Sequence, residues 1–301
     1  MRKIISGIAC AASLLAVAGA YAAGPVYHAV CVGVNKYDTD YVPRDNWLRG
    51  CVADASNLWT NFTQRGEWAP ANATLLLDGA ATKDAIRDAI TNAAAAAAPG
   101  DVFVYTHSSH GYSWPDEETG AYTANTGICA YDDDYEDFEL AADLAKFPSG
   151  AKVVVFVDAC HSAGLFKAKR KARARTAAAG AATAPFALAE RVGAAIDAIR
   201  AAEPVRRGGR PKGISSDEIG WVTAADYNQY SWDSEKERGG EFTMAAIRGW
   251  RTGACDVAPC GDEDCYANFY ELWNYAKDIA VGHDGEEEVE YPWETYRTDA
   301  Q

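Results

Sequence analysis

Residues 152–164 read KVVVFVDACHSAG, and this stretch decides the fold. The run VVVFV after Lys152 is apolar and mostly β-branched, which is typical of a strand covered on both faces. Further strands are predicted at 26–34, 73–77 and 101–106, alternating with helices at 48–62, 82–98 and 138–147. Strands separated by helices form βαβ units with right-handed crossovers. The sequence therefore predicts an α/β protein with a mostly parallel sheet.

The composition changes after this stretch. Residues 167–213 carry 12 basic and 3 acidic side chains among many alanines and glycines. We interpret them as a basic linker inserted into the domain rather than a core element, although a helix is possible at 187–202. Beyond the linker, the pattern predicts an edge strand at 220–224, a helix opened by the glycine pair at 239–240, and a last helix at 268–279.

The overall composition excludes several classes of protein. The chain has 301 residues, of which 49% are hydrophobic and 24% charged, as in an ordinary soluble globular protein. A disordered chain, a collagen and a small disulfide scaffold are therefore excluded. The net charge of −15 argues against a nucleic-acid-binding protein, which needs a basic face. It is compatible with cationic substrates or bound divalent cations.

The first 22 residues have the pattern of a secretory signal peptide. Arg2 and Lys3 precede an apolar run at 4–17, and small residues follow, so that cleavage is expected after Ala20 or Ala22. A membrane anchor is disfavoured because the apolar run is short and no other segment approaches about 20 apolar residues. We therefore expect an exported protein, periplasmic or secreted, with no membrane contact after signal removal.

Seven of the eight cysteines remain once the signal is removed. An odd number in an oxidising compartment implies a free thiol. Cys255, Cys260 and Cys265 lie close together in sequence, and two of them are expected to pair. A zinc site is disfavoured because no C-x-x-C motif or histidine accompanies them.

Two predicted strands lead into reactive side chains. One continues into THSSHG at 106–111 and the other into DACHSAG at 158–164. Functional groups gather beyond the carboxyl ends of parallel strands, so His110 and Cys160 could lie within proton-transfer distance. An imidazole beside a cysteine favours the nucleophilic thiolate and can protonate a leaving amine. Taken singly, each residue is more often structural, as a core cysteine or a strand-end histidine.

Together these segments resemble the metacaspase branch of the caspase-like cysteine peptidases. That branch has the motifs S-G-H-G and D-x-C-H-S-G, from which this chain departs at Ser109 and Ala163. The stretch LRGCVADA at 48–55 resembles the L-x-G-C-x-x-D-A element of the family, and GWVTAADYNQYSWD and GGEFT resemble two later elements. The resemblance covers about 26–279. The Q-A-C-x-G form of animal caspases is absent, which argues against cleavage after aspartate.

The resemblance implies a caspase-like three-layer α/β/α sandwich over residues 24–301 and a cysteine endopeptidase with a His110–Cys160 dyad. No third acid is implied. His107 is a rival base that the motif disfavours, and His161 is expected to be structural. The backbone N–H groups of Gly111 and Cys160 are the expected oxyanion donors.

The family also places a pocket for the substrate residue before the cleaved bond, the P1 residue, between four side chains: Cys51, Asp54, Ser108 and Asp158. Two carboxylates there would hold an arginine or lysine and repel an acidic residue. Alternatively, Asp54 caps a helix and Asp158 orders its own loop. We expect protein or peptide substrates cleaved after Arg or Lys.

An acidic region is a candidate calcium site. Many metacaspases need calcium, and their metal-binding aspartates occupy this stretch, here Asp116, Asp132, Asp133 and Asp134. Carboxylate oxygens suit a hard cation. However, the family aspartate after the CHSG motif is missing, with Lys167 in its vicinity, and a solvated acidic loop explains the region equally well. We expect no cofactor for the chemistry itself, with calcium as a possible activator.

The basic linker follows the segment that carries Cys160. In caspase-like proteins this position separates the large and small subunit regions, so a zymogen that cleaves its own linker is one interpretation. The other is a solvated insertion, and nucleic-acid binding is not expected of a body with the opposite charge. The alternative to an enzyme is a catalytically silent caspase-like scaffold, but the intact His110 and Cys160 favour the enzyme.

Overall fold

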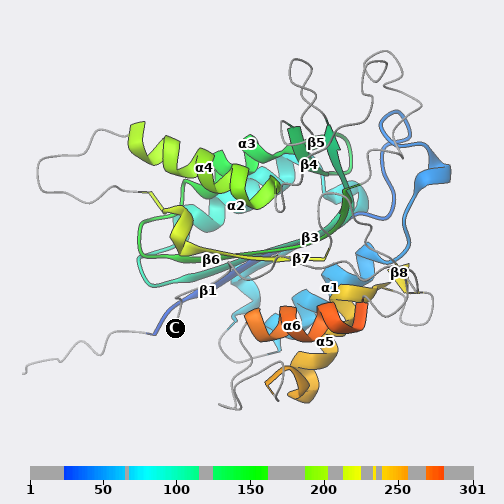
Figure 1. Ribbon diagram of the computed structural model, residues 1–301. Coiled ribbons are helices and arrows are strands. Elements are labelled where there is room, and N and C mark those ends of the chain that lie inside the picture. Colours follow the sequence, from blue (N-terminus) through cyan, green and yellow to red (C-terminus); the bar gives the residue numbers. More distant parts are fainter. Residues whose placement is uncertain are drawn as a thin grey trace, which may run out of the picture.

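The computed structural model describes residues 24–64, 68–114, 125–161, 187–202, 213–224, 233–234, 239–256 and 269–280. A seven-stranded mixed sheet forms its centre (Figure 1). Five strands run parallel in the order β2-β1-β3-β6-β7, and β4 and β5 extend the sheet with antiparallel pairing. The strands are β1 (Tyr27–Gly33), β2 (Ala73–Leu77), β3 (Val102–Trp114), β4 (Asn125–Cys129), β5 (Asp134–Glu136), β6 (Lys152–His161) and β7 (Ile219–Thr223). A separate two-stranded pair consists of β8 (Asp233–Ser234) and β9 (Gly239–Gly240).

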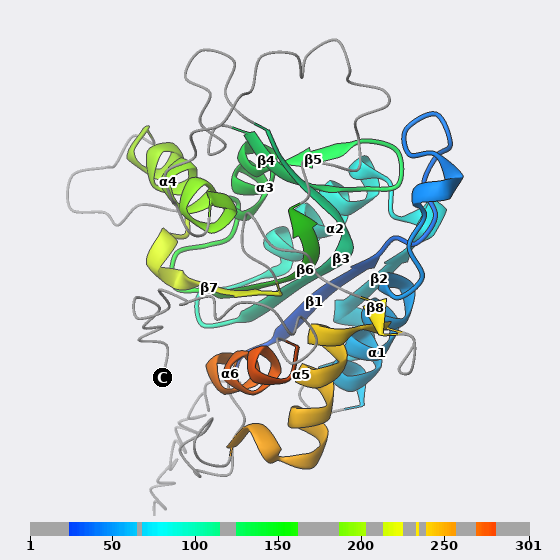
Figure 2. The same ribbon diagram turned by 45° about the vertical axis from the view of Figure 1, so that its right-hand side comes forward.

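Helices cover both faces of the sheet, as Figures 1 and 2 show. One layer contains α2 (Lys83–Ala96), α3 (Asp137–Leu144) and α4 (Ala187–Ala202). The other contains α1 (Cys51–Thr63), α5 (Glu241–Thr252) and α6 (Phe269–Ala280). This confirms the predicted α/β/α sandwich and the mostly parallel sheet.

Each face of the sheet packs its own apolar core. On the side of α2 and α3, the core includes Tyr105, Val155 and Leu144. On the side of α1 and α5, it includes Val104, Phe156 and Phe242. Val104 and Tyr105, and likewise Val155 and Phe156, are consecutive in sequence, so each strand supplies both cores alternately. A strand buried on both faces needs the continuous apolar run that the sequence shows.

Several helix ends follow directly from local sequence signals. The Thr82 side chain accepts a hydrogen bond from the Ala85 N–H at 3.2 Å and so caps α2, as predicted. Glu136 and Glu139 form a reciprocal capping box at the start of α3. Gly253 ends α5 in the left-handed conformation, with φ of 71°, which glycine adopts without a steric penalty.

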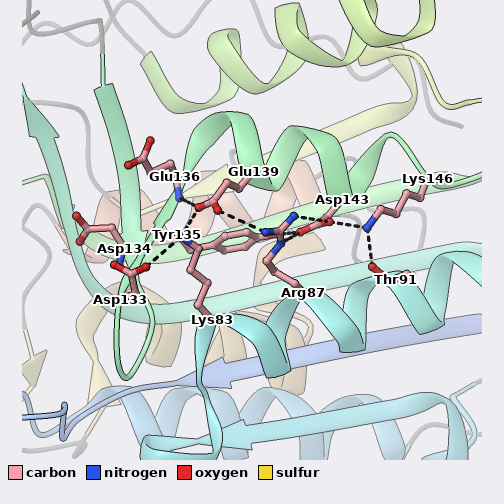
Figure 3. A network of polar contacts seen from close by, with 10 residues as sticks. All are labelled: Lys83, Arg87, Thr91, Asp133, Asp134, Tyr135, Glu136, Glu139, Asp143 and Lys146. Carbon is pink, nitrogen blue, oxygen red and sulfur yellow. Dashed lines mark hydrogen bonds and ion pairs between the residues drawn. The ribbon is translucent and has the colours of Figure 1, made fainter. Parts of the chain in front are cut away.

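A buried polar network joins α2 to α3 (Figure 3). Asp143 is fully buried and accepts hydrogen bonds from Arg87 Nε at 2.8 Å, Lys146 Nζ at 2.7 Å and the Tyr135 hydroxyl at 3.0 Å. Lys83 pairs with Glu139 at 2.8 Å beside it. A buried carboxylate is tolerated when several donors satisfy its oxygens, so this network fixes α3 against α2 at a defined position.

Two sequence interpretations need correction. The third and fourth predicted strands are longer than expected: β3 continues through the THSSHG segment to Trp114, and β6 continues to His161. The reactive residues His110 and Cys160 therefore lie within strands rather than in loops beyond them. In addition, β4 and β5 were not anticipated, because NTGIC and DYE are short and follow an acidic stretch without a strong strand pattern.

The predicted linker also contains a core element. Helix α4 has the expected bounds, and its Val192 and Ile196 are fully buried in the core on the α3 side. Residues 167–186 and 203–212 of the linker lie outside the described residues. Val192 and Ile196 are four positions apart and therefore share one helix face, which is enough to anchor the helix.

Cys255 is a buried free cysteine, so it does not take part in the predicted pairing. Cys260 and Cys265 lie outside the described residues, as does the predicted signal peptide at 1–22. Among the helices that the structure describes, none combines the length and the apolarity that crossing a membrane requires.

The burial of α4 predicts a measurable stability effect. Ile196→Ala removes a fully buried side chain and should lower the free energy of unfolding by about 2–5 kcal/mol. Ile199→Ala is the matched control on the same helix, since Ile199 is 37% exposed, and should change it by at most about 0.5 kcal/mol. Urea unfolding of the full chain measures both values. Equal effects of the two substitutions would show that α4 does not belong to the core.

Candidate active site

The ladder between β3 and β6 places the two predicted catalytic residues opposite each other. In its register Ser108 pairs with Asp158, and two residues further along His110 pairs with Cys160. Alternate residues of a strand share one face of the sheet, and so do directly opposite residues of neighbouring strands. Two predicted pocket residues and both dyad residues therefore occupy successive positions on one face. The structure describes the backbone of Cys160 but not its side chain.

The orientation of the His110 ring follows from its hydrogen bond to the loop after β1. His110 is buried, with 2% of its surface exposed, and its Nε2 lies 2.6 Å from the carbonyl oxygen of Asn46. A carbonyl oxygen can only accept, so Nε2 carries the proton. In the neutral imidazole, Nδ1 then has the lone pair and is the nitrogen that can take up a proton.

The His110 ring and backbone are also held by neighbouring side chains. The Tyr37 ring stacks on the imidazole with 5.4 Å between centroids and 23° between planes, and its hydroxyl accepts the His110 N–H at 2.8 Å. Ser109, where the family motif has glycine, donates from Oγ to the His110 carbonyl oxygen at 2.7 Å. Ser109 thus adds a hydrogen bond next to the candidate base His110 that the glycine of the motif could not form.

His107 has a separate environment. The Tyr105 hydroxyl donates to His107 Nδ1 at 2.6 Å, and His107 Nε2 donates to the carbonyl oxygen of Cys129 at 3.2 Å. Both ring nitrogens are therefore occupied in the neutral imidazole. Burial lowers the pKa of His107 to about 4, because a desolvated imidazolium is unfavourable. These contacts make His107 a structural residue and leave His110 as the candidate base.

Asp54 connects three segments of the chain. It lies in the first turn of α1 and is fully buried. Its Oδ2 accepts the Ser108 hydroxyl at 2.8 Å, and its Oδ1 accepts the Gly240 N–H at 2.8 Å. The predicted pocket residues Asp54 and Ser108 are therefore in direct contact. The two bonds join α1, β3 and the start of α5.

Asp158 is satisfied by the start of α5. Its Oδ2 accepts both the Thr243 N–H at 3.2 Å and the Thr243 hydroxyl at 2.6 Å. Gly240 lies between the two buried carboxylates: an added Cβ would overlap Asp158 Oδ2 and come within 2.9 Å of Asp54 Oδ2. A side chain at position 240 would thus displace at least one of them, so the glycine is required by close approach.

Cys51, the remaining predicted pocket residue, is the first residue of α1 and is 4% exposed. Its carbonyl oxygen packs against Gly33 so closely that a Cβ at position 33 would overlap it. The contact draws the start of α1 against the carboxyl end of β1. Cys51 is thus placed at the same sheet edge as Asp54.

The predicted oxyanion donors both lie in strands. Gly111 pairs with His161 of β6 and with Ile128 of β4, at the point where β4 begins to accompany β3. Cys160 is one position before His161 in β6. The two backbone groups are thus on adjacent strands, next to His110.

The acidic turn, residues 131–134, makes contacts with the protein itself. Asp132 Oδ1 accepts the backbone N–H of Lys83, and Asp133 Oδ2 lies 3.2 Å from Lys83 Nζ (Figure 3). Asp134 accepts the Tyr41 hydroxyl. In the described ranges, no group of three or more His, Cys, Asp or Glu side chains is arranged to hold a metal ion, and Asp116 lies outside them. These three aspartates alone therefore do not fit a calcium site.

Sequence reasoning missed the residues that hold the site from outside the motifs. Asn46 contributes only a backbone carbonyl, which any residue would supply, so its type carried no signal. Thr243 and Gly240 belong to the GGEFT stretch, in which the sequence predicts a helix start and a family element but no contact with the two carboxylates. Tyr37 follows β1 in a polar loop, and nothing in its surroundings distinguished it from other tyrosines.

Comparisons with known proteins agree with this architecture. The sequence profile of one protein family, described as the caspase domain, matches residues 27–261. Metacaspase-4 of Arabidopsis thaliana is 30% identical over 151 residues, and metacaspase-1 of Yarrowia lipolytica is 29% identical over 147 residues. These matches span 46% and 44% of this chain, but 34% and 31% of the relatives, so about a third of their length.

A solved structure is also similar. It is the crystal structure of protein GSU0716 from Geobacter sulfurreducens, with a TM-score of 0.52 and 29% sequence identity. The match covers 76% of this chain and 83% of that one. The likeness therefore extends over most of both folds.

The environment of His107 predicts a pH effect on stability. The unfolded chain binds a proton at His107 below a pKa of about 6.5, whereas the folded chain does so only below about 4. Stability is therefore lost as the pH falls through this window, by up to about 3 kcal/mol from this group. Urea unfolding between pH 7 and 4 should show that His107→Gln reduces the acid-induced loss. The same pH slope in both proteins would contradict this assignment.

Proposed function

We propose that this chain, which belongs to the caspase domain family, is a cysteine endopeptidase with Cys160 as nucleophile and His110 as base. The observation that carries the proposal is the β3–β6 register, in which His110 lies opposite Cys160. The Asn46 carbonyl supports it by assigning the proton of His110 to Nε2. The chain matches only part of its curated relatives, so the activity rests on this geometry as well as on the family.

The chemistry begins with a proton transfer. The Cys160 thiol gives its proton to His110 Nδ1, which leaves a thiolate and an imidazolium whose Nε2–H remains bonded to the Asn46 carbonyl. The thiolate attacks the carbonyl carbon of the scissile bond. The backbone N–H groups of Gly111 and Cys160 are the proposed donors to the oxygen that becomes negative in this step.

The second half returns the enzyme to its starting state. The C–N bond breaks, the leaving amine takes the proton from Nδ1, and the acyl group remains on sulfur as a thioester. Water then gives a proton to Nδ1 and adds to the thioester carbonyl. The C–S bond breaks, the proton on Nδ1 returns to the thiolate, and the carboxylic acid product leaves and loses its own proton to water.

We further propose cleavage after Arg or Lys. Asp54 and Asp158 are both buried within the site, one beside Ser108 and the other opposite it in the ladder. Two carboxylates at low exposure favour a guanidinium or ammonium group and disfavour an acidic side chain. Both aspartates also have a structural role, because both bind the start of α5; for Asp158, which lies within β6, this differs from the expected ordering of its own loop.

Three broader proposals concern how the peptidase is made and regulated. The basic linker contrasts with the rest of the chain, which carries 16 basic and 40 acidic side chains, and this contrast makes the linker a candidate for cleavage by the protein's own site.

Export is proposed from the signal pattern at 1–22, so that N-terminal mass spectrometry of the exported protein should find a start after Ala20 or Ala22. Calcium activation is retained as a proposal that needs ligands besides residues 132–134.

The activity itself predicts a specific outcome. The purified protein should cleave peptides with Arg or Lys at P1 and spare matched peptides with Asp at P1. Cys160→Ala should lower kcat by several orders of magnitude, because it removes the nucleophile. It should also leave the basic linker uncut when expressed alone. Repeating the assay with calcium and with EDTA tests the proposed activation.

The same assay separates the peptidase from a silent scaffold. A scaffold would show no cleavage, and an arginine-directed electrophile would label Cys160 no faster than a small uncharged reagent does. Cleavage after Asp would contradict the assignment of the pocket. Unchanged linker processing in Cys160→Ala would exclude self-cleavage.

A side chain at position 240 should impair recognition of the P1 residue without impairing the reactivity of Cys160. In Gly240→Ala the added methyl overlaps Asp158, so kcat/KM for an arginine peptide should fall at least about tenfold, or about 1.4 kcal/mol. Alkylation of Cys160 by iodoacetamide, a neutral reagent, should stay within about twofold. Gly79→Ala is the control, because the nearest atoms to its added Cβ lie 3.8 Å away. An equal loss in both assays would contradict the role in specificity.

A further inference from the structure

We propose that Tyr37 and Tyr41 are positioning residues that hold the His110 imidazole and connect it to the acidic turn. This inference rests on the proposed function, because it assigns a role to His110. It deepens that function by explaining what fixes the base in a dyad for which the family resemblance implies no third acid. Neither tyrosine is proposed to touch the substrate or to transfer a proton.

Tyr37 contacts His110 in two independent ways. Its ring is stacked on the imidazole, and its hydroxyl accepts the backbone N–H of His110. Tyr37 is 1% exposed, and burial raises the pKa of its phenol well above the usual range. It therefore stays protonated and acts by contact, not as a base. The stack limits tilting of the ring, and the hydrogen bond fixes the strand position from which the ring extends.

Tyr41 connects Tyr37 to the acidic turn. The two rings meet edge to face, with 6.3 Å between centroids. The Tyr41 hydroxyl donates to Asp134, the first residue of β5, which is 9% exposed. The Asp134 N–H is itself bonded to Asp133 Oδ1 at 2.9 Å. A bond from a half-buried phenol to a carboxylate is stronger than one between neutral groups, so Tyr41 has a firm anchor.

Backbone hydrogen bonds reinforce this connection. The Asp38 N–H donates to the carbonyl oxygen of Tyr131 at 2.9 Å, and the N–H groups of Tyr41 and Val42 return to the Asp38 carbonyl oxygen. The acidic turn is itself fixed to the start of α2, since the Tyr131 N–H donates to the Ala81 carbonyl oxygen at 2.9 Å. The loop after β1 is therefore attached to the acidic turn through both backbone and side chain.

The same loop supplies the Asn46 carbonyl. Asn46 lies in a short 3₁₀ helix at Arg44–Asn46, and its N–H is bonded to the Pro43 carbonyl oxygen at 2.9 Å. A shift of the loop would therefore disturb both the ring stack and the acceptor of Nε2. The acidic turn thus affects His110 through carboxylate contacts to the protein, whether or not it binds a cation.

Three conservative substitutions test the proposal. Tyr41→Phe removes the bond to Asp134 but keeps the ring, and Tyr37→Phe removes the acceptor of the His110 N–H but keeps the stack. Tyr105→Phe is the matched control: it is a fully buried tyrosine on the same sheet whose hydroxyl bonds His107 instead. None of the three removes a carboxylate, so lost calcium binding cannot account for an effect.

The expected result separates catalysis from folding. Tyr37→Phe and Tyr41→Phe should lower kcat for an arginine peptide by about tenfold, with KM within about twofold, because binding of the P1 residue does not involve them. The rate of Cys160 alkylation by iodoacetamide at pH 7, followed by mass spectrometry, should fall in parallel. Tyr105→Phe should lower thermal stability but leave kcat and alkylation within about twofold of the wild type.

Asp134 provides a rescue experiment. Asp134→Asn keeps an oxygen that can accept from the Tyr41 hydroxyl, whereas Asp134→Ala does not. Asp134→Ala should therefore reproduce the loss of Tyr41→Phe, and Asp134→Asn should retain at least half of the wild-type rate. Equal losses in both variants would indicate that the charge matters, not the hydrogen bond, and would overturn the proposal.

The remaining outcomes distinguish this inference from the proposed function. Unchanged kcat and alkylation in Tyr37→Phe and Tyr41→Phe would overturn the positioning role while peptide cleavage by the wild type still supports the peptidase. A wild type that cleaves no peptide, combined with slower alkylation in both variants, would overturn the peptidase and support the positioning role. No cleavage together with unchanged alkylation would overturn both.

Discussion

The parallel pairing of β3 with β6 is the constraint on which the site depends. Ten consecutive register pairs, from Val102 with Lys152 to Gly111 with His161, set Ser108 opposite Asp158 and His110 opposite Cys160. A slip of one residue would reverse the faces of one strand, so that a buried apolar face would meet the wrong core. The two apolar cores therefore also fix which polar residues lie opposite each other at the ends of β3 and β6, because the cores tolerate only this register.

The second constraint is the cost of burying carboxylates. Asp54 and Asp158 are accommodated because Ser108, Gly240 and Thr243 supply donors, and the last two come from a segment that follows the basic linker in sequence. The start of α5 is thus needed to complete the site, even though β1, β3 and β6 are assembled from the chain before the linker. If the linker is cut, these hydrogen bonds and the apolar core beside α5 are what hold the two parts together.

The sequence predicted the sheet, the helices and the motif residues, because apolar periodicity and the spacing of His110 and Cys160 are local properties. It did not predict that β3 and β6 continue through these residues, since THSSHG and DACH look like loops when their burial is unknown. Nor did it predict that α4 belongs to the core, because Val192 and Ile196, which are buried among the side chains that the structure describes, stand between charged and small residues and give a weak pattern. The Asn46 carbonyl was beyond sequence reasoning, as backbone groups have no residue signature.

The two histidines of β3 differ in the hydrogen-bond partners of their ring nitrogens, and these partners decide which ring can act as a base. Both are almost fully buried and lie three positions apart on one strand, and in both Nε2 donates to a backbone carbonyl oxygen, so that the Tyr105 hydroxyl at Nδ1 of His107 is what distinguishes them. The Tyr105 hydroxyl donates to Nδ1 of His107 and so occupies the lone pair that a base needs. The Asn46 carbonyl accepts from Nε2 of His110 and so leaves the lone pair on Nδ1. A neutral imidazole has one donor and one acceptor nitrogen, so an acceptor partner directs basicity to the other nitrogen while a donor partner suppresses it. The proposed role of His110 as base is therefore supported by the acceptor at its Nε2, while the Tyr105 hydroxyl disfavours His107 in that role.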